Sequence, residues 1–104
     1  MKLQCERNGG RQVLRPEGEF NIYGAIDFRE ALVAAVHAEG DIDVDLSAAS
    51  EMDAAGLQLL LLARREAAAS GKLLRLIAPG AAVLEVMGLC NLASRFEIGR
   101  SAEA

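Results

Sequence analysis

Residues 41–46 read DIDVDL, and residues 52–57 read MDAAGL at the start of a leucine-rich segment. The first run alternates charged and apolar side chains with a period of two, which is typical of a β-strand. The second run predicts the start of a helix over residues 54–70, because the carboxylate of Asp53 can cap its free amide groups. Functional residues often lie at such a turn in small α/β domains. We therefore expect a site here, although Ala54 and Ala55 occupy the positions that could carry a reactive hydroxyl.

The segments around this junction also have clear patterns. The sequence NGG at residues 8–10 predicts a β-hairpin, because the central residues of such a turn need a positive φ. An apolar face predicts a helix around residues 28–36, with Asp27 and Glu30 in capping-box spacing and Gly40 just past its end. The remaining elements are expected to be strands over residues 2–7, 11–15, 19–23 and 73–77, a short helix over residues 81–87 and a tail over residues 89–98 that packs on the body.

This order of elements predicts an α/β fold, with a mixed β-sheet of four to five strands and helices packed on it. A length of 104 residues, with 52% hydrophobic and 25% charged residues, predicts a single domain over residues 1–104. No apolar run approaches the ~20 residues that cross a bilayer, and the N-terminus has no apolar signal core. We therefore expect a cytoplasmic protein without membrane insertion.

The charge balance argues against one class of partner. The net charge is −4, and the isoelectric point is about 4.9. Binding to nucleic acid phosphates needs a basic surface, so we expect no nucleic acid partner.

Asp41, Asp43 and Asp45 could suggest a metal site. A calcium loop that began at Asp41 would need glycine at its sixth position and glutamate at its twelfth, but Leu46 and Met52 stand there. A phosphatase-like nucleophile at Asp43 should end an apolar strand, and Asp43 instead lies inside an alternating one. The pattern favours a strand with one polar face, and we expect no metal site.

The other reactive side chains give little support to catalysis. His37 is the only histidine, is expected in the last turn of its helix and has no titrating partner in the sequence. Cys5 and Cys90 are the only cysteines, and their spacing indicates buried or inert thiols in a reducing compartment. No glycine pattern that cradles phosphate occurs. The sequence therefore predicts no catalytic residue and no cofactor.

Five stretches together resemble a known family. They are GEFNIY (residues 18–23), DVDLS (43–47), MDAAGLQLL (52–60), GKLLRL (71–76) and AVLEVMGL (82–89). They are similar to the STAS domain, the fold of bacterial anti-sigma factor antagonists that also occurs in the tails of sulfate transporters. The resemblance covers nearly the whole chain.

The resemblance implies a non-enzymatic switch module. In the family, a partner serine kinase of the anti-sigma type phosphorylates a Ser or Thr in this turn, and the added charge releases the partner. Ala55 takes the place of the usual acceptor, and Ala54 takes the place of the hydroxyl residue seen one position earlier. Ser47 and Ser50 do not match the motif. The implied partner surface comprises Asp53, Ala54, Ala55, Gly56, Gln58, Ser47 and Ser50, with Leu57 assigned to the core.

The missing acceptor leaves several functions open. One is a module that binds a kinase-like anti-sigma factor or another signalling partner, including those of chemotaxis clusters, without phosphorylation control. Another is a STAS subunit that contacts the ATPase of an ABC-type phospholipid transport complex. An engineered alanine at a natural phosphosite and formation of a homodimer also stay open.

Overall fold

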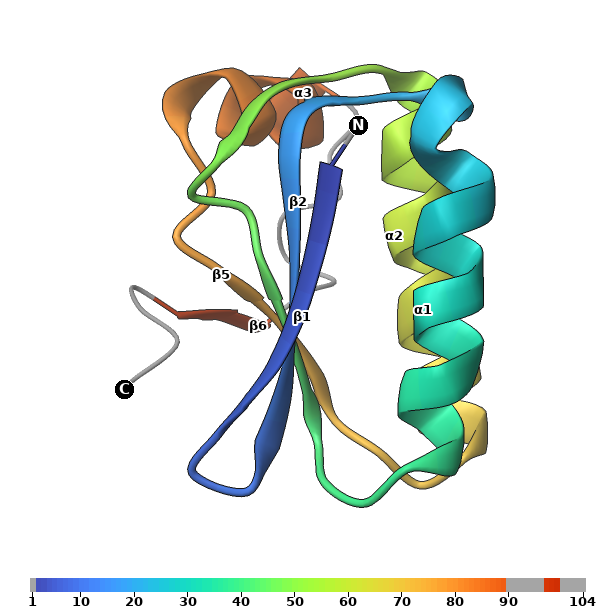
Figure 1. The fold of residues 1–104 in the computed structure, drawn as a ribbon. Helices are drawn as coiled ribbons and strands as arrows, with labels where there is room; N and C mark the ends of the chain where they lie inside the picture. Colours follow the sequence, from blue (N-terminus) through green and yellow to red (C-terminus); the bar gives the residue numbers. More distant parts are fainter. Residues whose placement is uncertain (1, 90–96, 100–104) are drawn as a thin grey trace.

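The computed structural model describes residues 2–89 and 97–99 (Figure 1). Its elements follow the order β1 (Lys2–Asn8), β2 (Arg11–Phe20), η1 (Ile22–Gly24), α1 (Ala25–His37), β3 (Ile42–Asp45), β4 (Ala49–Met52), α2 (Ala54–Ala69), β5 (Leu74–Ile77), α3 (Ala81–Leu89) and β6 (Glu97–Gly99). Of these described helices, none is both long and apolar enough to cross a membrane.

The strands form a mixed sheet, as the sequence predicts. The order is β1-β2-β3-β5-β6, and β4 pairs with β2 away from this path. β1 and β2 are antiparallel and joined at Gly9 and Gly10, whose φ angles of 58° and 82° confirm the predicted hairpin. The pairings β2–β3, β2–β4, β3–β5 and β5–β6 are parallel. The tail residues 90–96, expected to pack on the body, lie outside the described residues.

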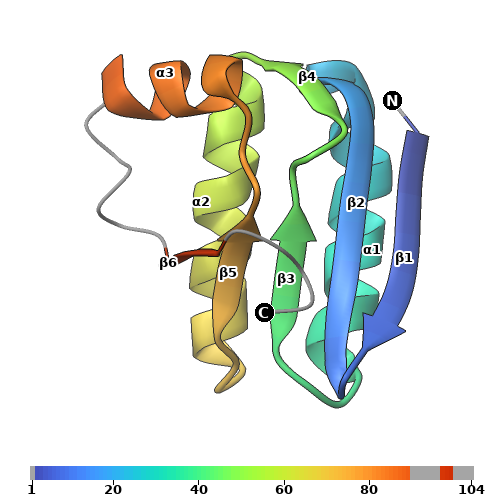
Figure 2. The same ribbon diagram turned by 90° about the vertical axis from the view of Figure 1, so that its left-hand side faces the viewer.

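α1 and α2 lie side by side on one face of the sheet and begin at the same end of the molecule (Figures 1 and 2). This direction follows from the topology, because each helix connects parallel strands and must return the chain to their starting edge. α3 lies at the end where α1 and α2 begin (Figure 2). The strand-to-helix turn at Asp53 is at that same end.

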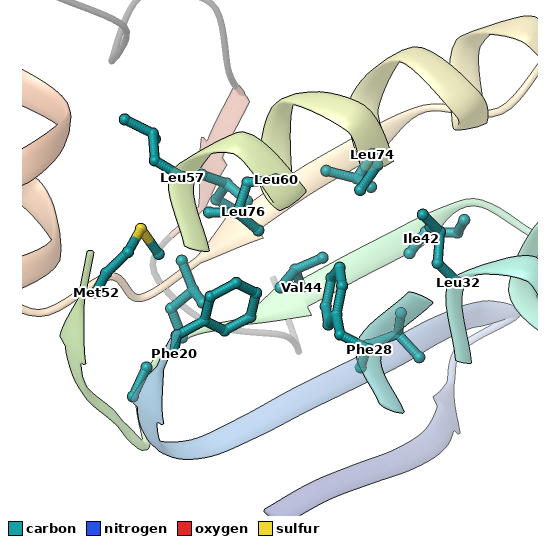
Figure 3. Packing of buried hydrophobic residues seen from close by; sticks show 14 of the residues in the cluster. Phe20, Phe28, Leu32, Ile42, Val44, Met52, Leu57, Leu60, Leu74 and Leu76 are labelled. Atoms are coloured by element: carbon teal, nitrogen blue, oxygen red, sulfur yellow. The ribbon is translucent and has the colours of Figure 1, made fainter. Parts of the chain in front are cut away.

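The core fills the space between the sheet and the two long helices (Figure 3). Phe20 and Phe28 meet edge to face, with ring centroids 5.1 Å apart and an interplanar angle of 73°. Leu60 and Leu76 are fully buried beside them, and burying such a side chain stabilises the fold by about 1.5–3 kcal/mol. Leu57 is buried, which confirms its expected place in the core.

The other face of the sheet carries the polar side chains of β3, but they are not solvated. Asp43 is 0% exposed, and Asp45 is 6% exposed. Asp43 accepts hydrogen bonds from Arg11 Nε at 2.9 Å and from Arg75 Nε and Nη2, both at 3.0 Å. Arg15 Nε donates to Asp45 at 3.0 Å. The arginines on neighbouring strands thus compensate carboxylates that burial alone would penalise.

The prediction of a separate strand over residues 19–23 is wrong. β2 continues through Pro16 and Gly18 to Phe20. The amides of Gln12 and Gly18 donate to Asp41 and Ala48, so the nitrogen of Pro16 faces the same side. On that side, β2 pairs with β3 up to Leu14 and with β4 from Gly18 onward. Pro16 therefore lies in the gap, where its missing N–H breaks no ladder bond.

Two further local expectations are corrected. α1 begins at Ala25, so Asp27 lies within its first turn and is not the N-cap. Asn21 caps the preceding turn instead, its Oδ1 accepting from Tyr23 N at 3.0 Å. The sequence does not predict β4. In this strand Ala49 and Met52 are buried and the two residues between them are exposed, so its side chains lack the period of two by which a strand is recognised.

Candidate functional site

The candidate site is built on the turn between β4 and α2. Asp53 is the N-cap of α2, as predicted, and its Oδ1 accepts from Gly56 N at 2.8 Å. The amide of Asp53 in turn donates to Phe20 O at 3.4 Å. The end of β2 and the cap therefore fix the position of the helix start from two sides.

Gly56 brings this helix start into close contact with β2. The residue is buried, and a Cβ at this position would overlap the carbonyl oxygen and the ring of Phe20. The close approach that glycine permits is thus to a strand of the same chain. Gly56 positions the turn and does not present a surface.

Ala54 and Ala55 lie at the surface of the first turn of α2. Ala54 is exposed, and Ala55 is half-buried. Their methyl groups occupy a helix N-terminus, where unpaired amides would favour an anionic group. Neither side chain can accept a phosphoryl group or donate a hydrogen bond. Gln58 follows on the same face, three residues after Ala55, and is exposed.

The two serines named from the sequence lie before the helix. Ser50 is exposed within β4, and Ser47 is exposed in the turn between β3 and β4. The amide of Ser47 donates to Asp45 Oδ1 at 2.9 Å. Burial alone would raise the pKa of Asp45, but hydrogen bonds from Ser47 and Arg15 outweigh burial and lower that pKa. Asp45 therefore holds this turn as an ionised carboxylate.

A small polar hollow of ≈ 150 Å³ lies beside the turn. Its lining includes the carboxylates of Glu19, Glu51 and Asp53 together with Asn21, which donates to Glu19 at 3.3 Å. No group of three potential ligands that could hold a metal ion occurs among the described residues. Three carboxylates make this end of the site negative, which favours contact with basic groups.

An apolar surface that sequence reasoning missed adjoins the turn. Ile22 and Tyr23 of η1 and Ile26 in the first turn of α1 are exposed by 62%, 89% and 72%. Ile22 and Ala55 both line a larger groove along α2. The expectation of a strand over residues 19–23 hid this surface, since alternate side chains of that strand would have faced the core. Consecutive large apolar residues after Asn21 are the signal that could have revealed it.

The remaining reactive groups offer no catalytic arrangement within the described part of the chain. His37 is exposed in the last turn of α1, as expected. Cys5 was expected to be buried or inert, and it is exposed on β1. Partial burial of its thiol raises its pKa, which lowers its reactivity. Cys90 lies outside the described residues.

Comparisons with known proteins agree with this geometry. The family model described as "Mlab, STAS domain" matches residues 3–98. None of the curated proteins compared matches the chain.

Several solved structures share the fold. An anti-sigma factor antagonist from Mycobacterium paratuberculosis superposes with a TM-score of 0.85 at 21% identity, covering 98% of this chain and 87% of that one. The anti-sigma factor antagonist SpoIIAA in its unphosphorylated form gives a TM-score of 0.81 at 23% identity, covering 98% of this chain and 90% of that one. The Bacillus cell fate determinant SpoIIAA in its phosphorylated form gives 0.76 at 23% identity, covering 98% and 94%.

The order of strands and helices, the capped turn before α2 and the family match over residues 3–98 lead to one conclusion. This chain belongs to the STAS domain family.

Proposed function

We propose that this chain is a non-enzymatic protein-interaction module of the anti-sigma factor antagonist kind. It acts in the cytoplasm as one domain over residues 1–104 and binds a kinase-like anti-sigma factor or another bacterial signalling partner. The contact surface centres on Asp53, Ala54, Ala55 and Gln58 and extends to the exposed Ser47 and Ser50, while the buried Gly56 holds the turn in place. The observation that carries this proposal is the first turn of α2, which Asp53 caps and which has the exposed Ala54 and the half-buried Ala55 at its surface.

Binding at this turn is independent of phosphorylation in this proposal. A phosphorylated hydroxyl would add about −1.5 to −2 charge at the helix start, beside the carboxylates of Glu51 and Asp53. Alanine at positions 54 and 55 removes that means of release. The partner therefore stays bound unless another signal displaces it.

The same observation also favours a second candidate function. A STAS subunit of an ABC-type phospholipid transport complex is a permanent component and needs no phosphoacceptor. Its surface would be the same turn, and its partner would be the transporter ATPase. The two candidates thus differ in the partner and not in the site.

Affinity capture from the native lysate tests both candidates. A histidine-kinase-like ATPase supports the first function, and a transporter ATPase supports the second. Ala54→Glu should abolish capture, because it adds an exposed carboxylate to the first turn of α2, one residue before the acceptor-equivalent Ala55. Ala81→Glu is the matched control, since Ala81 is also exposed at the first position of a helix.

Two results would contradict the proposal. Equal capture by the wild type and Ala54→Glu would move the contact surface away from this turn. Incorporation of labelled phosphate from ATP by the captured kinase would show that the chain retains phosphorylation control. Ala55→Ser, treated in the same way, is expected to gain phosphate and lose the partner.

A further inference from the structure

A groove runs along α2 away from the candidate site. It has a volume of ≈ 770 Å³, and its α2 lining extends from Ala55 to Ala68. The thirteen residue steps from Ala55 to Ala68 correspond to about 20 Å of helix, so the groove continues from the turn almost to the end of α2. Ile22 of η1 and Ala25 of α1 complete its lining.

The floor of the groove is apolar and incompletely covered. Leu59 and Leu62, three residues apart on α2, are both half-buried. Leu59 also packs on the core, whereas Leu62 is not among the residues of the core cluster. Together with the exposed Ile22, these two leucines contribute to the apolar part of the groove lining, which we call the leucine strip.

The far end of the groove is positively charged. Arg64 and Arg65 line it, and no lining residue carries a carboxylate. Both arginines are exposed, and no carboxylate of the described residues lies within ion-pair distance of either. This positive end stands out on a chain of net charge −4. A ligand in the groove would therefore gain from negative charge at this end.

We infer that this groove binds an amphipathic helix of the protein partner, with aspartate or glutamate side chains over Arg64 and Arg65. This inference rests on the proposed function and extends the contact surface from the turn along α2. A helix of about 13 residues matches the length of the groove, and its apolar side chains at i, i+3, i+4 and i+7 would contact the leucine strip. The carboxylates would fix the direction of the partner helix.

Site-specific photo-crosslinking in the native cell tests the inference separately from the proposed function. A benzoylphenylalanine is placed at Ala54, next to the turn, at Ala68, at the far end of the groove, or at Ala34, an exposed control position on α1. We expect Ala54 and Ala68 to crosslink to the same protein and Ala34 to give no such product. The peptide joined to Ala68 should be helical, with one apolar face and carboxylates near the crosslink.

Each other outcome overturns a specific statement. A crosslink from Ala54 alone would retain the proposed function and refute the groove. A crosslink from Ala68 to a second copy of this chain would replace the partner helix by a homodimer. A partner peptide without carboxylates, or one that is extended, would refute the stated chemistry. The absence of crosslinks from every position would remove the proposed function as well.

Affinity measurements with the captured partner test whether its carboxylates contact the arginines of the groove. Arg65→Glu should raise Kd by about three- to tenfold, and Arg65→Gln should raise it by less. Raising the salt concentration should reduce the difference between wild type and Arg65→Glu. Lys2→Glu is the matched control, because it changes the net charge equally at an exposed position on β1. Equal effects of Arg65→Glu and Lys2→Glu would refute a local contact.

Discussion

Replacing Asp43 by Asn tests whether the arginines stabilise the sheet. The side chain is 0% exposed, and its two oxygens accept three hydrogen bonds from two guanidinium groups. A hydrogen bond to a charged group contributes about 1.5–3 kcal/mol, and such contributions are not additive. Arg11 and Arg75 are 26% and 18% exposed, so water compensates part of the loss. We expect Asp43→Asn to lower the free energy of unfolding by about 3 kcal/mol.

Urea unfolding followed by circular dichroism measures this loss, and a thermal melt should show Tm lowered by roughly 12–24 °C. Asp41→Asn is the control on the same segment, because Asp41 is 41% exposed and its Oδ1 accepts from Leu73 N, a bond that an amide oxygen preserves. We expect that control to change the free energy by less than about 1 kcal/mol. If Asp43→Asn also stays within about 0.5 kcal/mol of wild type, the buried charge contributes no net stability and the reasoning fails.

Three further perturbations address the turn and its supports. Asp53→Ala should lower the free energy of unfolding in urea by about 1 kcal/mol, because it removes the carboxylate that accepts from Gly56 N. Asp53→Asn should retain most of that stability, since its side-chain oxygen can still accept this hydrogen bond. Equal losses for the two variants would refute the capping role. Gly56→Ala should lower the free energy of unfolding, although alanine favours helices, because the added Cβ overlaps Phe20. Gly88→Ala is the control: its added Cβ meets no atom within 4 Å, so the change should be neutral or stabilising by up to about 1 kcal/mol. A greater loss of stability for Gly88→Ala than for Gly56→Ala would contradict the packing. The pKa of Asp45 is lower in the folded state, so its stabilisation is present above the unfolded pKa of about 3.9 and is lost as the pH falls through the folded value. The stability difference between wild type and Asp45→Asn should therefore shrink on acidification, and a difference that stays constant down to about pH 2 would exclude this linkage.

The sequence predicts the parts of the fold that depend on local pattern. The hairpin at Gly9 and Gly10, the helix capped by Asp53 and the mixed sheet all follow from turn chemistry and periodicity. The family resemblance likewise points to the STAS fold, which the match over residues 3–98 confirms.

The parts that the sequence misses depend on partners in space. Pro16 normally interrupts a strand, and only the gap between the β3 and β4 pairings makes it acceptable in β2. Asp43 has the sequence signature of a solvated strand face, and its burial depends on arginines 32 residues away in either direction. The exposed Ile22 and Tyr23 are apolar residues that a pattern assigns to the core by default. Their role as surface residues emerges once β2 is seen to end at Phe20.

The exposed first turn of α2 has a consequence for how regulation can evolve in this chain. Ala54 contributes little to packing, and the cap and the contact with Phe20 are made by its neighbours. A serine or threonine codon differs from an alanine codon by a single base. A hydroxyl at Ala54, or at the acceptor-equivalent Ala55, could therefore be gained or lost in one mutational step without a change in the fold. The residues that stabilise the turn are neighbours of the residues that could carry a phosphoryl group, but they are not the same residues. Selection can therefore change phosphorylation of the turn and leave its stability unchanged.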